Sequence, residues 1–210
     1  MIGILKRDIS LLISSKQMII FMLFYIPLLL FVSESFVPEI LYFMILVFYT
    51  YMMSTTSFTY DLTGKSKYVI NSLPINRNEL VIYKYLSIFI YFSITVVYAG
   101  VYLWIINILK LADVDYFNLR GIMNAIPTIM IYVSIVFPTF IRFEPRVAQI
   151  INIILFMTFF IISSNISYTG DKGALKYLGV LKWEYIMAIA LVMYILSLLL
   201  SIHLYKNRDI

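Results

Sequence analysis

The sequence predicts an all-α membrane protein with six transmembrane helices, because its composition and its long apolar runs both require lipid. Of its 210 residues, 62% are hydrophobic and 13% are charged, whereas soluble domains are about 45–50% apolar and about 25% charged. A soluble fold of this size could not bury so much apolar surface. The apolar runs are continuous rather than alternating and approach the length of about 20 residues that a helix needs to cross a bilayer. The spans are therefore predicted to be helices and not strands.

The predicted spans form one transmembrane domain, residues 1–210, with both termini in the cytoplasm. They lie roughly at residues 17–37, 39–59, 80–109, 119–141, 147–165 and 184–205. With this orientation most of the 16 Lys and Arg residues fall in cytoplasmic segments, as the positive-inside rule expects. The first run follows basic residues, as in a signal peptide, but no small-residue cleavage site follows it, so we expect a retained helix.

The N-terminal segment MIGILKRDISLLISSKQ predicts an amphipathic helix that lies in the inner membrane interface. Its apolar residues recur at helical spacing: Ile2, Leu5, Ile9 and Leu12. Its polar residues lie largely off that stripe: Lys6, Arg7, Ser10 and Ser14. The alternative is that the first span begins early and frays. The net charge of +5 is interpreted as topological bias and contact with anionic lipid, not as binding of nucleic acid.

Residues 60–86, YDLTGKSKYVINSLPINRNELVIYKYL, interrupt the apolar pattern and divide at Pro74. Before the proline, four residues could form one apolar face of a short cytoplasmic helix: Tyr68, Val69, Ile70 and Leu73. A polar loop explains the local chemistry of this segment. It does not explain an apolar face with nothing in its own chain to bury it, whereas a partner protein would.

After Pro74, the spacing of Asn76 and Glu79 predicts a capping box at the start of a new helix. This helix is expected to run from about Leu80 to Lys110, and at 1.5 Å per residue it would be about 46 Å long, longer than the membrane core of about 30 Å. Its first turns must tilt strongly or project into the cytoplasm, and Lys84 favours projection.

A second cytoplasmic connection, IRFEPRVAQ at residues 141–149, contains Arg142, Glu144, Pro145 and Arg146. Taken alone it predicts a tight positive-inside turn.

The sequence predicts neither catalytic residues nor a metal site in this chain. With no cysteine and one histidine, it lacks the residues for a Cys/His metal cluster. Gly64-Lys65-Ser66 resembles the end of a phosphate-binding P-loop, but Thr59 stands where that motif needs a glycine. The ionisable residues near the spans fall at predicted span ends, which disfavours an ion-coupled carrier. They are Glu34, Glu39, Asp61, Glu79, Lys84, Lys110, Glu184 and His203.

Uncharged polar residues inside the predicted spans could line a substrate path. They are Thr50, Ser54 and Ser57 in the second span, Asn124, Thr128 and Ser134 in the fourth, and Asn152 and Thr158 in the fifth. The more common role of such residues is to bond neighbouring helices to one another, and that alternative has the greater weight.

The central segment resembles the permease subunits of type 2 ABC transporters, in particular short bacterial permeases that export antimicrobial or toxin peptides. The resemblance rests on Tyr60-Asp61, Leu73-Pro74-Ile75-Asn76-Arg77, Glu79-Leu80-Val81 and Lys84-Tyr85. In that family the segment contains a coupling helix between the second and third spans, which docks on a separate cytoplasmic ATPase. Span number, orientation and the amphipathic N-terminal segment agree along the chain. Asn76 stands where a serine is more usual, and both residues cap helices well.

The resemblance implies an exporter subunit that pairs with a second permease, identical or related, and with ATPase subunits that bind ATP and Mg²⁺. The implied ATPase contact comprises Asp61, Lys65, Lys67, Tyr68, Val69, Leu73, Pro74, Asn76, Arg77 and Glu79, with a second contact at Arg142, Glu144 and Arg146. The expected location is the bacterial cell membrane, and the expected cargo is an amphipathic peptide, drug or lipid. Two alternatives predict no ATPase partner: a membrane-embedded ligand-binding or immunity protein, and a secondary carrier.

Overall fold

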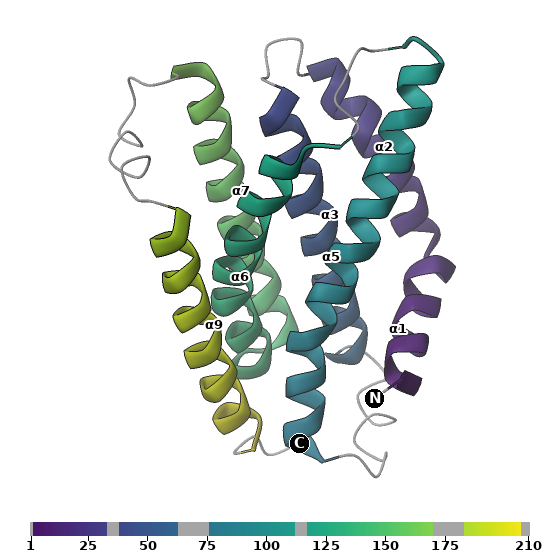
Figure 1. Ribbon diagram of the computed structural model, residues 1–210. Helices are drawn as coiled ribbons and strands as arrows, with labels where there is room; N and C mark the ends of the chain where they lie inside the picture. The colour runs from purple at the N-terminus through teal and green to yellow at the C-terminus, as the bar shows by residue number, and fades with distance from the viewer. Residues whose placement is uncertain (1, 33–37, 63–75, 112–116, 170–182, 207–210) are drawn as a thin grey trace. The chain divides into compact units, whose positions relative to one another are not determined.

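The computed structural model describes residues 2–32, 38–62, 76–111, 117–169 and 183–206, and all regular structure in these ranges is helical (Figure 1). This confirms the all-α class. The helices are α1 (Ile2–Ser14), α2 (Lys16–Val32), α3 (Pro38–Leu62), α5 (Arg77–Ile108), α6 (Leu119–Arg142), α7 (Pro145–Thr169) and α9 (Trp183–Lys206). Each predicted span overlaps one of the helices from α2 to α9, and α1 corresponds to the helix predicted at the N-terminus.

In the described ranges, α3, α5, α6 and α9 are each long and apolar enough to cross a membrane. The pair α1 and α2 would make a fifth span if it is counted as one bent element, and the part of α7 whose side chains are described includes a shorter apolar helix, Arg146–Phe159. The structure thus supports four to five spans by length and composition, and the count of six stays a prediction.

The bend between α1 and α2 is 69° and lies at Ser15, the residue between the two helices. The Ser15 side chain accepts a hydrogen bond from the backbone N–H of Met18 at 3.4 Å, and its carbonyl accepts from Ile19 at 3.1 Å. A serine that satisfies free amides in this way is a favourable N-cap. The first turn of α2 is therefore capped by Ser15 rather than by continuation of α1.

Within α2, Pro27 has no N–H to donate to the carbonyl of Leu23, four residues earlier. The hydroxyl of Tyr102, from α5, donates to that carbonyl at 2.8 Å. In a membrane a released carbonyl must find another donor inside the protein. The tyrosine replaces the hydrogen bond that the proline removes.

The neighbouring carbonyl of Met22 also accepts from tyrosines. Tyr49 of α3 donates to it at 2.6 Å, and Tyr98 of α5 donates at 3.0 Å. The Tyr49 and Tyr98 rings meet edge to face with centroids 5.6 Å apart. The proline-containing segment of α2 is thus fixed to both α3 and α5.

The long helix α5 has 32 residues and confirms the helix expected from about residue 80 to 110. Asn76 is its N-cap residue with extended backbone, but its side chain makes no capping hydrogen bond, so the capping-box prediction is wrong. Both Asn76 and Glu79 are exposed, which leaves water available to the first amides. At the other end, Lys110 has a left-handed backbone, with φ of 53°.

The chain divides into two compact units, Met1–Ala125 and Ile126–Ile210. In the first, α3 packs against α5 more extensively than any other pair of helices for which contacts are described, and α1 contacts both α2 and α3. In the second, Tyr132 of α6 donates to Asn152 of α7, and Ser197 of α9 donates to the carbonyl of Ser134 at 2.7 Å. Whether these units act as the single domain expected from the sequence stays a prediction.

The connection between α6 and α7 consists of Phe143 and Glu144, followed by Pro145 as the first residue of α7. Proline suits this position because the first amides of a helix have no partner within the helix. Arg142, Glu144 and Arg146 are exposed around this tight turn.

Candidate functional site

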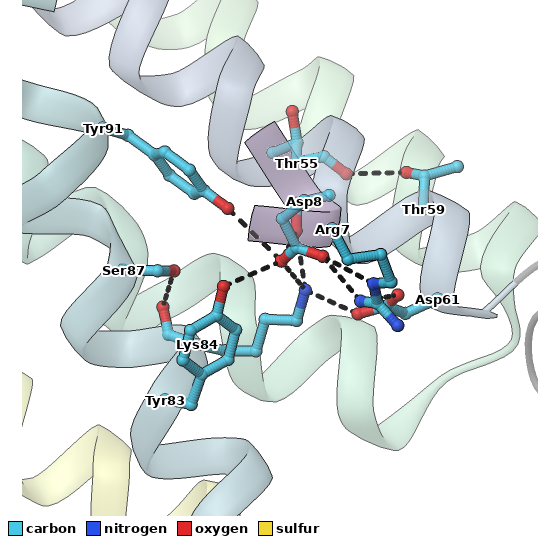
Figure 2. Close-up of polar contacts among 10 residues, drawn as sticks. Arg7, Asp8, Thr55, Thr59, Asp61, Tyr83, Lys84, Ser87 and Tyr91 are labelled. Atoms are coloured by element: carbon cyan, nitrogen blue, oxygen red, sulfur yellow. Dashed lines mark hydrogen bonds and ion pairs between the residues drawn. The ribbon is translucent and has the colours of Figure 1, made fainter. Parts of the chain in front are cut away.

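Four charged side chains from three helices of the first unit meet inside it (Figure 2), and we call them the charge cluster: Arg7 and Asp8 of α1, Asp61 of α3 and Lys84 of α5. Each cation contacts both carboxylates. Arg7 Nη2 lies 2.6 Å from Asp8 Oδ1 and 2.7 Å from Asp61 Oδ1. Lys84 Nζ lies 2.9 Å from Asp8 Oδ2 and 2.5 Å from Asp61 Oδ2. The cluster has no net charge.

The charge cluster is almost entirely shielded from solvent. The exposed fractions of the side chains are 0% for Asp8, 4% for Lys84 and 9% for Asp61, while Arg7 at the edge is 31% exposed. An unpaired charge buried in this way costs several kcal/mol, even after the protein relaxes around it. Mutual pairing is therefore a condition for these helices to pack as they do.

Asp8 lies at the centre of the hydrogen-bond network. Besides Lys84, its Oδ2 atom accepts from Ser57 at 2.7 Å, from Tyr83 at 3.2 Å and from Tyr91 at 3.4 Å. These donors come from α3 and α5, so the carboxylate of α1 is held by both helices. Figure 2 shows Tyr83, Lys84 and Tyr91 of α5 pointing toward it.

Lys84 is fixed by several groups at once. It donates to Ser57 Oγ at 2.6 Å, and its Nζ lies 5.5 Å from the ring centroid of Phe58 and 5.8 Å from that of Tyr83. Aromatic faces attract cations at this range. Two carboxylates and these rings thus give Lys84 an internal site, and the expectation that the first turns of α5 tilt or project into the cytoplasm stays a prediction.

The local sequence of α1 explains why Asp8 is buried. Ile4, Asp8 and Leu12 are spaced by four residues, share one helix face and are all buried. Leu5 and Ile9, which belong to the predicted apolar stripe, are partly buried. Asp8 was not among the predicted site residues. The sequence did contain a signal for a buried acid at this position, because apolar residues stand four positions before and four positions after Asp8.

The residues predicted to contact an ATPase lie partly outside the described residues: Lys65, Lys67, Tyr68, Val69, Leu73 and Pro74. Asp61 belongs to the charge cluster, and Asn76, Arg77 and Glu79 lie at the start of α5. The second predicted contact, Arg142, Glu144 and Arg146, is exposed in the turn between α6 and α7. Asp61 contacts Lys84, which lies near the start of α5. The ATPase contact itself stays a prediction.

Several of the residues predicted to line a path bond neighbouring helices. Thr50 of α3 donates to Thr95 of α5 at 3.4 Å, Ser57 reaches Asp8 of α1, and Asn152 accepts from α6. Ser54 bonds back to the carbonyl of Thr50 at 2.7 Å, and Ser134 bonds back within α6. The remaining ones differ in burial: Asn124 and Thr158 are exposed and Thr128 is partly buried. The contacts of Thr50, Ser57 and Asn152 join different helices, as the helix-bonding alternative expects, and the path stays a prediction.

The family model for ABC-2 family transporter proteins matches residues 3–206, which cover nearly all of both compact units. The chain belongs to this family. Comparisons with curated proteins and with solved structures each found no match. Membership confirms the resemblance to type 2 ABC permeases and makes this ABC-2 family protein a membrane component of a transporter. Within its first unit, the charge cluster joins α1, α3 and α5 through four ion pairs.

Proposed function

We propose that this ABC-2 family protein is the membrane subunit of an ATP-driven exporter for amphipathic peptides, drugs or lipids. It forms the substrate path with a second permease in the bacterial cell membrane, and separate cytoplasmic ATPase subunits supply the energy. The observation that carries the proposal is the family match over residues 3–206. The helical fold with four to five apolar spans agrees with it.

The charge cluster supports a mechanical role for the connection between α3 and α5. Asp61 lies in the last turn of α3 and Lys84 near the start of α5, and their ion pair of 2.5 Å joins these two helix ends. A force applied to the connection between Leu62, where α3 ends, and Arg77, where α5 begins, would therefore act on both helices together. This is the property that a segment coupled to an ATPase requires.

The test is co-purification of an ATPase with the tagged chain, expressed together with any ATP-binding-cassette ATPase that a neighbouring gene is found to encode. We expect the unmodified chain to retain the ATPase, and Arg77→Glu and Leu73→Asp to lose most of it while still inserting in the membrane. The matched controls are Arg120→Glu and Leu111→Asp, which place the same changes on the opposite predicted side.

Equal retention of the ATPase by all five chains would contradict the docking residues. Absence of any ATPase from the purified unmodified chain would contradict the exporter and favour the ligand-binding protein or the secondary carrier. Because insertion is scored separately, by fractionation of membranes, a folding defect cannot imitate the loss of a docking contact.

A further inference from the structure

The way the charges of the cluster are distributed among the helices suggests which helix can move. Among the four charged residues, α1 carries one acid and one base, Asp8 and Arg7, and these two are in contact at 2.6 Å. The pair formed by α3 and α5 likewise carries one acid and one base, Asp61 and Lys84, in contact at 2.5 Å. Separation of α1 from the rest leaves two neutral ion pairs.

Separation of any other helix leaves an unbalanced charge. If α5 moved away, Lys84 would leave without a partner and the remaining three residues would carry a net negative charge. If α3 moved away, Asp61 would leave alone. Because an uncompensated buried charge is far more costly than a neutral pair, the cluster opposes movement of α3 or α5 much more strongly than release of α1.

The junction between α1 and α2 is suited to such a movement. Ser15 is the one residue between the two helices, and its hydroxyl caps the first turn of α2 through Met18. The start of α2 therefore keeps a partner for its amide whatever the position of α1. A hinge needs only a few backbone torsions at the end of an element to change.

From the charge partition and the capped junction, we propose that α1 is a releasable latch. In the docked state it holds the ends of α3 and α5 through Asp8, and it swings away at Ser15 as a helix that keeps its own Arg7–Asp8 pair. Docking is held by the two crossed ion pairs, by the hydroxyl donors to Asp8 and by Leu12, which packs with Met53 and Tyr91. The latch itself does not depend on an ATPase, and only its use in transport rests on the proposed function.

The chain has no cysteine, so single thiols can report release. Leu12 of α1 and Met53 of α3 belong to the same apolar cluster and are 7% and 5% exposed. We would label Leu12→Cys and Met53→Cys with N-ethylmaleimide in the full chain, purified without nucleotide in lipid nanodiscs. Release of α1 exposes the first position, whereas the second loses only the cover of Leu12 and keeps its contact with Thr95 of α5, so we expect Leu12→Cys to react at least tenfold faster.

A second pair of variants tests whether the charges hold the latch. Adding Arg7→Gln with Asp8→Asn removes the neutral pair of α1 and leaves Asp61 with Lys84, so labelling at Leu12→Cys should accelerate at least tenfold and at Met53→Cys less than twofold. Equal labelling rates at the two positions of the parent chain would overturn the latch, because both would then open together. A Leu12→Cys rate that the charge variants leave unchanged would overturn the role of the cluster.

Discussion

Asp8 accepts hydrogen bonds from α3 and α5 as well as from its neighbour Arg7, and its side chain is fully buried. Its carboxylate balances half of the positive charge in the cluster. Such a network is not retained simply because it stabilises a protein, since apolar side chains of the same volume are often as good or better. In the docked state, the network joins α1 to both α3 and α5.

Asp8→Asn should lower the free energy of unfolding by about 3–5 kcal/mol, because it leaves two cations with one carboxylate in a buried site. Lys84→Met should lower the free energy of unfolding by a similar amount, because it leaves two buried carboxylates with one cation. The double variant Asp8→Asn/Lys84→Met retains the balanced Arg7–Asp61 pair, so its loss should be clearly smaller than the sum. Denaturant unfolding of the four chains in detergent micelles measures this. A double variant whose loss equals the sum would show that charge balance is unimportant here.

Lys110 follows the C-cap residue of α5 in the left-handed conformation that glycine adopts most easily. Its N–H donates to the carbonyl of Asn107 at 3.1 Å, and the next N–H, of Leu111, donates to Ile106 at 3.2 Å. Lys110→Gly keeps these bonds and removes the steric strain of a Cβ atom, so it should raise stability by roughly 1 kcal/mol. Leu109→Gly, at a residue with φ of −74°, should lower stability instead. Thermal unfolding compares the two, and a loss for both would refute the strain at Lys110.

The contact of α2 with α5 depends in part on a backbone carbonyl that Pro27 leaves without a hydrogen-bond donor inside the helix. This is the carbonyl of Leu23, and the hydroxyl of Tyr102 from α5 donates a hydrogen bond to it. Three tyrosine hydroxyls in all reach the Met22 and Leu23 carbonyls of this one turn. The proline therefore provides an attachment point as well as a bend.

Tyr102→Phe should destabilise the chain by about 1–2 kcal/mol, because the Leu23 carbonyl then has no donor in an apolar environment. In a Pro27→Ala background the same change should cost much less, since the alanine N–H can donate to that carbonyl within the helix. The four chains form a double-mutant cycle that unfolding measurements can close. An identical cost of Tyr102→Phe in both backgrounds would mean that the tyrosine does not compensate for the proline.

The helices differ sharply in how much of their surface the protein itself covers. Of the apolar window of α3, 83% is buried, whereas only 22% of that of α9 is buried. α3 is thus an inner helix of the first unit, whereas many apolar side chains of α9 are exposed. This difference is expected of a membrane protein, in which apolar surface need not be hidden from the solvent.

The location of the helices followed from the sequence because backbone groups in lipid must be paired within a helix, so each long apolar run becomes one. The charge cluster could not be foreseen in this way. Its members are separated by 54 residues between Arg7 and Asp61 and by 76 between Asp8 and Lys84, and only packing of three helices brings them together. Lys84 was expected in turns of α5 that tilt or project beyond the membrane core, because the helix is longer than that core. Its pairing with two distant carboxylates was not part of that expectation. The capping box failed for a local reason, since an exposed asparagine can leave its neighbours' amides to solvent.

The pairing of charges inside α1 also bears on how the protein is assembled during translation. Asp8 is synthesised 76 residues before its partner Lys84. Until that residue is made, Arg7, the immediate neighbour of Asp8, can balance its charge. Because α1 is made before α3 and α5, its docking through Asp8 can be completed only after both of these helices have been made.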